Sequence, residues 1–163
     1  MQLSKSGILI GLGIVACLVQ DAQASRSHVL AGKSGGPASS GATCRDCHGN
    51  VVGTGSVEIL GAPDKYQADA VYDLTVRVSD PTKLGAGFQI SVEDVSGNHI
   101  GTLSVIDSVK TELNPSDPTY LNHTSDGVDA SVAAWPANGN SYSFPARWTA
   151  PSTDMGTVTF WAA

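Results

Sequence analysis

The sequence lacks an apolar run long enough to cross a membrane. The longest such run, from Gly7 to Val19, is shorter than the about 20 residues that a membrane-spanning helix needs. Lys5 precedes it and Ala22-Gln23-Ala24 follows it, which is the order of a secretory signal peptide and its cleavage site. We therefore expect no transmembrane span, removal of residues 1–24 and export to the periplasm or the cell exterior.

Cysteine is scarce, with three residues in 163. Only Cys44 and Cys47 remain if the signal peptide is removed, so the exported chain has no disulfide framework. Ile14-Val15-Ala16-Cys17 also resembles a bacterial lipobox. In that alternative Cys17 is retained and carries a lipid anchor, which on its own binds a membrane only weakly.

Basic residues are outnumbered, with 9 Lys and Arg against 15 Asp and Glu and a formal net charge of −6. This balance excludes nucleic acid and anionic membrane as expected partners. It favours a redox partner protein with a basic docking surface. The sequence also has no nucleophile elbow, no zinc-protease helix motif and no phosphate-binding loop, so we do not expect an enzyme.

The motif that is present is Cys44-Arg45-Asp46-Cys47-His48. Two cysteines three positions apart, followed at once by histidine, form the attachment motif of a c-type haem. The two thiols bond covalently to one haem, and His48 binds the iron as its proximal ligand. A thiol redox pair and half of a zinc site use a similar spacing, but export of the chain favours haem c as the cofactor.

The rest of the chain divides by composition. Residues 25–55 are rich in Gly, Ser and Ala and predict a flexible haem-binding arm. Residues 56–163 contain about seven short alternating segments separated by Gly, Pro and Asp turns, and no convincing helix. This pattern predicts an all-β, immunoglobulin-like antiparallel β-sandwich in which each sheet has one buried and one solvated face. The expected strands are Val57–Ile59, Val71–Ser79, Phe88–Val92, Ile100–Ile106, Tyr120–Thr124, Tyr142–Trp148 and Val158–Ala162.

These features together resemble the bacterial reeler-like (reelin-domain-like) secreted proteins with a haem-attachment motif before the sandwich. The stretches that carry the resemblance are Gly35-Gly36-Pro37 with Thr43–His48, Gly87-Phe88-Gln89, Tyr120–Thr124, and Trp148–Pro151 with Gly156–Ala163. The resemblance implies the sandwich, a secreted or surface location and haem at the cysteine motif. Such domains usually continue past the final strand, whereas this sequence stops at Ala163. Either the last strand is missing, which leaves an open sheet edge through which molecules could self-assemble, or the sequence is incomplete.

The sixth ligand of the iron is open at this stage. His123 is the first candidate, since it lies in an extended stretch and belongs to the His-Thr motif of the resemblance. His28, in the arm, is the second. His99 follows a turn and Met155 lies in a loop, so both rank lower, and an open position with water is the remaining alternative.

Two strong axial ligands leave no coordination position for a substrate. We therefore expect a single-haem c-type cytochrome outside the cytoplasm that acts in electron transfer. One form that this role could take is that of a subunit in a surface assembly. The main alternative is a surface adhesion or structural β-sandwich module without a redox role. A haem enzyme or sensor would need an open sixth position.

Overall fold

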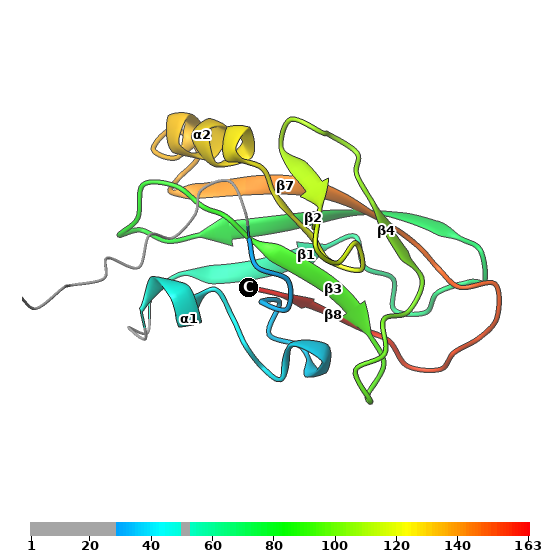
Figure 1. Ribbon diagram of the computed structural model, residues 1–163. Helices are drawn as coiled ribbons and strands as arrows, with labels where there is room; N and C mark the ends of the chain where they lie inside the picture. The colour runs from blue at the N-terminus through cyan, green and yellow to red at the C-terminus, as the bar shows by residue number, and fades with distance from the viewer. Residues whose placement is uncertain (1–28, 50–52) are drawn as a thin grey trace, which may run out of the picture.

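The computed structural model describes residues 29–49 and 53–163. Within them eight strands form two four-stranded sheets, and every paired strand is antiparallel (Figure 1). The predicted antiparallel β-sandwich is confirmed. The first sheet has the order β1 (Ser56–Leu60), β2 (Val71–Ser79), β7 (Ser141–Thr149) and β4 (Thr102–Ser104). The second has the order β5 (Thr111–Leu113), β6 (Leu121–His123), β3 (Gln89–Glu93) and β8 (Thr159–Ala162).

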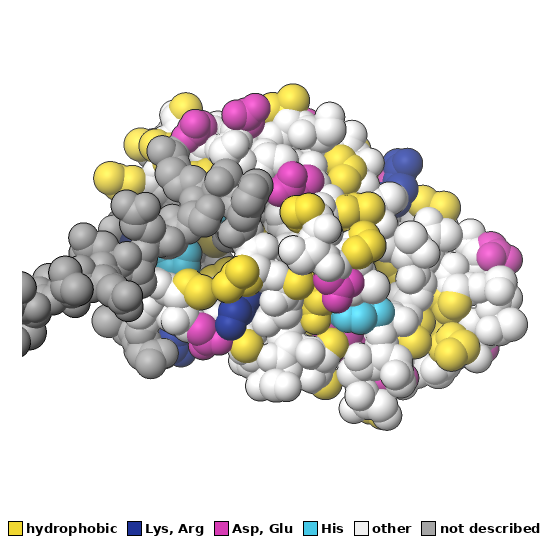
Figure 2. Space-filling view, in the orientation of Figure 1, with side chains coloured by type: hydrophobic (Ala, Val, Ile, Leu, Met, Phe, Trp, Pro, Cys, Tyr) yellow, Lys and Arg dark blue, Asp and Glu magenta, His cyan; other side chains and the backbone are white. Residues whose placement is uncertain are grey.

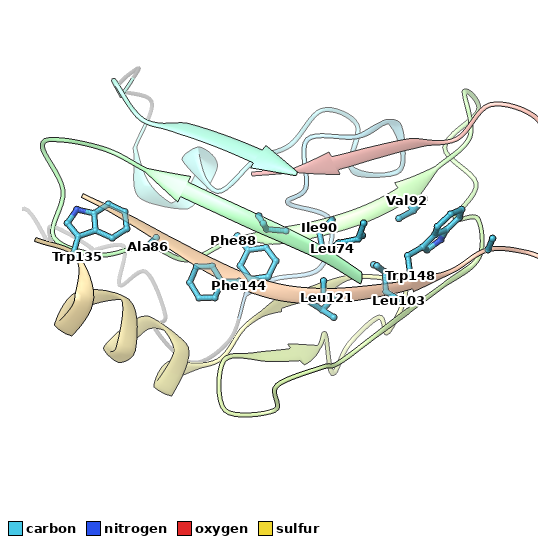
Figure 3. Close-up of a cluster of buried hydrophobic side chains, with 13 residues drawn as sticks. Leu74, Ala86, Phe88, Ile90, Val92, Leu103, Leu121, Trp135, Phe144 and Trp148 are labelled. Atoms are coloured by element: carbon cyan, nitrogen blue, oxygen red, sulfur yellow. The ribbon is translucent and has the colours of Figure 1, made fainter. Parts of the chain in front are cut away.

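The long pair β2 and β7 forms the centre of the first sheet, in a register that runs from Val71 opposite Thr149 to Ser79 opposite Ser141. Alternate residues of both strands face the second sheet, as period-two patterning requires. Figure 3 shows the resulting core, with Phe88 and Phe144 at its centre and Trp135 and Trp148 at opposite ends. The rings of Phe88 and Phe144 lie 4.7 Å apart between centroids.

The expectation that the chain has no helix is wrong. One α-helical turn, α1 (Arg45–His48), contains part of the cysteine motif, and a longer helix, α2 (Ser125–Ala134), follows β6. Thr124 caps α2 in extended conformation and accepts a hydrogen bond from the Gly127 N–H at 2.9 Å, the usual role of an N-cap threonine. Small residues dominate α2, so it lacks the apolar stripe by which a helix is recognised.

The N-terminal segment (residues 29–49) differs from the flexible arm that composition predicted. It begins against the second sheet, contains a short 3₁₀-helix, Pro37–Ser39, and closes on itself through a bridge between Ser34 and Thr43. The Ala38 N–H donates to Glu93 Oε2 at 2.8 Å, and the Ser34 and Ser91 hydroxyls lie 2.8 Å apart. These polar contacts fix the segment on the outer face of β3.

This packing also corrects the expectation of one solvated face for each sheet. All five residues of β3 are buried. Ile90 and Val92 belong to the core between the sheets. The polar side chains of Gln89, Ser91 and Glu93 alternate with them and form hydrogen bonds to or beside the N-terminal segment.

The signal peptide of residues 1–24, including Cys17, lies outside the described residues. No helix in the described part of the chain has the length and apolar character needed to cross a membrane. β8 lies at an edge of the second sheet, and self-assembly through that edge stays a prediction.

Candidate functional site

The cysteine motif occupies one helical turn. Cys44 stands at the N-cap with helical dihedral angles, and the backbone N–H groups of Cys47 and His48 donate to its carbonyl oxygen at 3.2 and 3.1 Å. Positions three and four apart on a helix lie on the same side, so the turn brings both thiols and the imidazole to one face. Lys33 Nζ ties the turn to the beginning of the N-terminal segment through Asp46 Oδ2 at 2.9 Å.

The two thiols are free and differ in exposure, with Cys44 partly buried and Cys47 exposed. Burial raises the pKa of the Cys44 thiol, since desolvation disfavours the thiolate, and the neighbouring Cys47 acts in the same direction. A redox-active thiol pair needs a lowered pKa at its nucleophile. The environment of Cys44 therefore argues against a thiol oxidoreductase.

α1 opens onto a cavity of about 830 Å³ at one end of the sandwich. Figure 1 shows α1 and α2 near this end, on either side of the loop that joins β2 to β3, and residues of all three line the cavity. Known ligand pockets have volumes of about 300–1,000 Å³, so the space suits a large cofactor. Its apolar walls come mainly from Val29, Leu30, Val57, Val78, Leu84, Ala86, Val128, Val132 and Trp135.

Cys44, Cys47, His48 and His123 all line this cavity. The structure thus brings the predicted first-choice distal ligand, at the end of β6, together with the attachment motif. Burial lowers the pKa of His123, and the nearby His48 also lowers it, against a smaller opposing effect of a hydrogen bond with the Phe88 backbone. His123 is therefore neutral near pH 7, which is the form that binds a metal.

Two neighbours hold the His123 ring. The Phe88 N–H and the Phe88 carbonyl oxygen lie 2.8 and 3.1 Å from the same ring atom, Nδ1, which can accept from the N–H or donate to the carbonyl but not both at once. The tautomer with its proton on Nδ1 donates to the carbonyl and leaves Nε2 a free lone pair, the usual arrangement of a metal-binding histidine. Gly87 packs so close that a Cβ there would lie 2.4 Å from Cε1 of the ring, so only glycine leaves room for it.

The other candidate ligands lie elsewhere or outside the described residues. His99 lines a separate cavity of about 270 Å³, and its ring packs edge-on against Tyr120. Met155 is exposed in the loop between β7 and β8, where its N–H donates to the Tyr66 hydroxyl at 2.7 Å. His28 lies outside the described residues, although Val29, which follows it, lines the large cavity.

The residues present fit a c-type haem. The cavity offers two thiols for covalent attachment, an imidazole beside them, a second imidazole held by backbone contacts, and largely apolar walls for the porphyrin. The described residues contain no group of three or more His, Cys, Asp and Glu side chains placed to hold a bare metal ion. A haem iron takes only its axial ligands from the protein.

Sequence reasoning missed most of the cavity wall. It did not assign Lys83 to Gly87, or Val128 and Val132 of α2, to the site. The Thr124 cap was a usable signal for α2, but nothing in a single sequence showed that this helix would lie beside the cysteine motif. On the face shown in Figure 2, acidic side chains are scattered and basic ones are few and separate, in keeping with the net charge of −6.

Neither a family model nor a curated protein matches the sequence. Among solved structures, the fold is similar to the reeler domain of human F-spondin, with a TM-score of 0.48 and 21% identity over 66% of this chain and 72% of that one. It is likewise similar to the Reelin-N domain of F-spondin, with a TM-score of 0.46 and 21% identity over 66% of this chain and 69% of that one. The likeness concerns the fold alone.

Proposed function

We propose that this protein is a single-haem c-type cytochrome outside the cytoplasm, in which His48 and His123 are the axial ligands and the activity is electron transfer. The observation that supports the proposal most strongly is the shared cavity of Cys44, Cys47, His48 and His123. His48 and His123 come from distant parts of the chain, and the fold gives both access to one apolar space.

Each residue of the site has a separate role in this proposal. Cys44 and Cys47 tether the cofactor, so its retention does not depend on a closed pocket. His48 would hold the iron beside the tether, and His123, whose ring contacts the Phe88 backbone, would supply the second imidazole. Haem iron exchanges one electron between its ferric and ferrous states, and occupation of both axial positions leaves none for a substrate.

The protein contributes by limiting solvent and by fixing the ligands. The apolar wall lowers the local dielectric constant, which disfavours the ferric form with its additional positive charge and raises the reduction potential. Bis-histidine ligation gives a lower reduction potential than histidine–methionine ligation does. No side chain has to act as an acid, a base or a nucleophile.

An adhesion or structural module is the second candidate. The observation in its favour is that the core between the sheets, from Leu74 to Ala150, packs without any contribution from the cysteine turn. The sandwich can therefore fold and present a surface whether or not a cofactor is attached. In this alternative Cys44 and Cys47 are a free thiol pair at the end of the domain.

The test is to express the full exported chain in a host that has the c-type maturation machinery. We expect a Soret band, a mass increase of one haem and a low-spin ferric spectrum. The Cys44→Ala/Cys47→Ala variant should lose covalent haem and keep the β-sheet circular dichroism of the wild type. A colourless wild-type protein under these conditions would support the adhesion module instead.

The sixth ligand is tested separately. His123→Ala should convert the ferric spectrum from low spin to high spin, because the iron loses one strong ligand. His99→Ala is the matched control, since His99 lines a different cavity, and should leave the spectrum unchanged. If His28→Ala gives the high-spin spectrum and His123→Ala does not, the sixth ligand is His28.

A further inference from the structure

The two nitrogens of the His123 ring lie in different surroundings. The Phe88 N–H points at Nδ1 at a distance of 2.8 Å, and the Phe88 carbonyl oxygen lies 3.1 Å from the same atom. Phe88 is fully buried, and Figure 3 shows its side chain in the core between the sheets. Because the Phe88 backbone occupies the space beside Nδ1, an iron bound by this ring has to bind at Nε2.

The backbone beside the ring forms only one of two possible hydrogen bonds. Gln89 lies opposite Asn122 in the register of β3 and β6, so Phe88 faces His123 at the next position. Facing residues of antiparallel strands can exchange two backbone bonds. Here the His123 N–H donates to the Phe88 carbonyl oxygen at 3.3 Å, whereas the Phe88 N–H donates to the ring. The Phe88 carbonyl therefore has a donor without the ring, but the Phe88 N–H depends on the ring for its acceptor.

These contacts decide where the neutral ring carries its proton when no metal is bound. With the proton on Nε2, Nδ1 accepts from the Phe88 N–H, and both polar groups of the Phe88 backbone are satisfied. With the proton on Nδ1, two N–H groups would face each other across 2.8 Å. The buried Phe88 N–H would then have no acceptor among the residues that the structure describes, and such a donor is costly to leave unpaired.

We infer that the Phe88 amide holds His123 with its proton on Nε2 in the cofactor-free chain, and that His123 becomes an iron ligand only by moving this proton to Nδ1. The second half of the inference rests on the proposed function, and the first half does not. The proton count of the ring stays constant. One proton leaves Nε2, one is taken up at Nδ1, and the lone pair freed on Nε2 forms the bond to iron.

Binding of His123 to iron therefore breaks a buried hydrogen bond. A metal-binding histidine usually donates its other N–H to a carbonyl or carboxylate, which favours the metal-binding tautomer before the metal arrives. At this site the Phe88 carbonyl can take that role, but the Phe88 N–H at 2.8 Å favours the opposite tautomer. Phe88 is thus a positioning residue whose backbone amide competes with the iron for the form of the ring.

The first experiment locates the proton without any haem. The full chain carrying Cys44→Ala/Cys47→Ala is isotope-labelled, and nuclear magnetic resonance at near pH 7, where the ring is neutral, identifies the protonated nitrogen of His123. We expect a protonated Nε2, an unprotonated Nδ1 and a nitrogen–nitrogen coupling from Nδ1 to the Phe88 amide across the hydrogen bond. His48, which is exposed, is the internal control and should show no such coupling. A proton on Nδ1 would overturn the inference.

The second experiment follows the Phe88 amide after haem attachment, in the reduced low-spin protein, which is diamagnetic. Hydrogen exchange of this amide should be at least about tenfold faster than in the cofactor-free chain, because ligation removes its acceptor. The Ala86 amide is the matched control, since it donates to Ser131 Oγ at 2.9 Å and should exchange no faster. General stabilisation by a cofactor slows exchange, so it cannot produce acceleration at Phe88 alone.

The two experiments separate the inference from the proposed function. Equal or slower exchange at the Phe88 amide in the low-spin haem protein would overturn the movement of the proton. A wild-type chain that acquires no haem would overturn the proposed function, while the first experiment would still decide where the cofactor-free ring carries its proton.

Discussion

Gly87→Ala is the substitution that tests the geometry of the site most directly. The added Cβ would lie 2.4 Å from Cε1, 2.6 Å from Nδ1 and 2.9 Å from Nε2 of His123. The ring has to move by about 1 Å to regain ordinary van der Waals contact. That movement breaks the hydrogen bond between Nδ1 and the Phe88 backbone.

The expected cost has two parts. Insertion of a methyl group into a packed site costs about 1–3 kcal/mol, and loss of one neutral hydrogen bond costs about 1 kcal/mol. We therefore expect the free energy of unfolding of the cofactor-free cysteine variant to fall by about 2–4 kcal/mol. For a domain of this size that loss lowers Tm by roughly 5–15 °C, which thermal unfolding followed by circular dichroism can measure.

Two comparisons isolate the clash with the ring. At Gly53 an added Cβ would meet only ordinary contacts, the nearest being Asp80 Oδ2 at 3.5 Å, so Gly53→Ala should change Tm little. In a His123→Ala background the ring is absent, and Gly87→Ala should then cost less than about 1 kcal/mol. An equal cost in both backgrounds would refute the packing of Gly87 against His123. In the haem-loaded protein, Gly87→Ala should also give high-spin ferric iron.

Three further substitutions test other parts of the structure. Thr124→Ala removes the N-cap acceptor of Gly127 N–H and should cost about 1 kcal/mol, measured by urea unfolding; no loss would mean that α2 does not depend on this cap. Glu93→Gln replaces the charged acceptor of the Ala38 N–H with a neutral amide oxygen, so we expect about 1 kcal/mol of destabilisation and faster proteolysis before β1. Equal cleavage of both proteins would contradict the docking. Hydrogen bonds from Thr82 hold the pKa of Asp80 below its usual value. Because the pKa in the folded state lies below that in the unfolded state, the ionised carboxylate stabilises the fold above about pH 4. This stabilisation is lost as the pH falls through the folded-state pKa. Asp80→Asn should therefore flatten the acid limb of the Tm profile, and an unaltered limb would exclude this role.

The strands were accessible from the sequence because burial on one side imposes a period of two. Tyr72 to Val78 alternates clearly, and β2 covers the predicted range from Val71 to Ser79. β5 escaped prediction because Thr111–Leu113 contains a single apolar residue, Leu113, so no alternation is visible there. α2 escaped because its small residues carry no apolar stripe and Gly127, a poor helix former, stands within it.

The outer face of β3 shows a different limit. Gln89, Ser91 and Glu93 have the pattern of a solvated face, yet each is fully buried. Their partners come from a segment more than fifty positions earlier in the chain, such as Ser34 and Ala38. A polar residue that faces water and one that faces a docked polar segment look the same in a single sequence, because both satisfy their hydrogen bonds.

The candidate site combines a local signal with a placement that only the fold provides. The spacing of Cys44, Cys47 and His48 follows from the pitch of one helical turn, so it is readable in the sequence. The position of His123 relative to the cysteine turn depends on the pairing of β6 with β3 and on the docking of the N-terminal segment over β3. If that segment were released, the cysteine turn would lose its fixed position relative to His123. The contact of Glu93 with the segment therefore supports the relative position of the cysteine turn and His123 without touching either. Under the proposed function, Glu93→Gln should increase the high-spin fraction of the haem-loaded protein. A merely stabilising role of Glu93 would leave the spin state of the folded fraction unchanged.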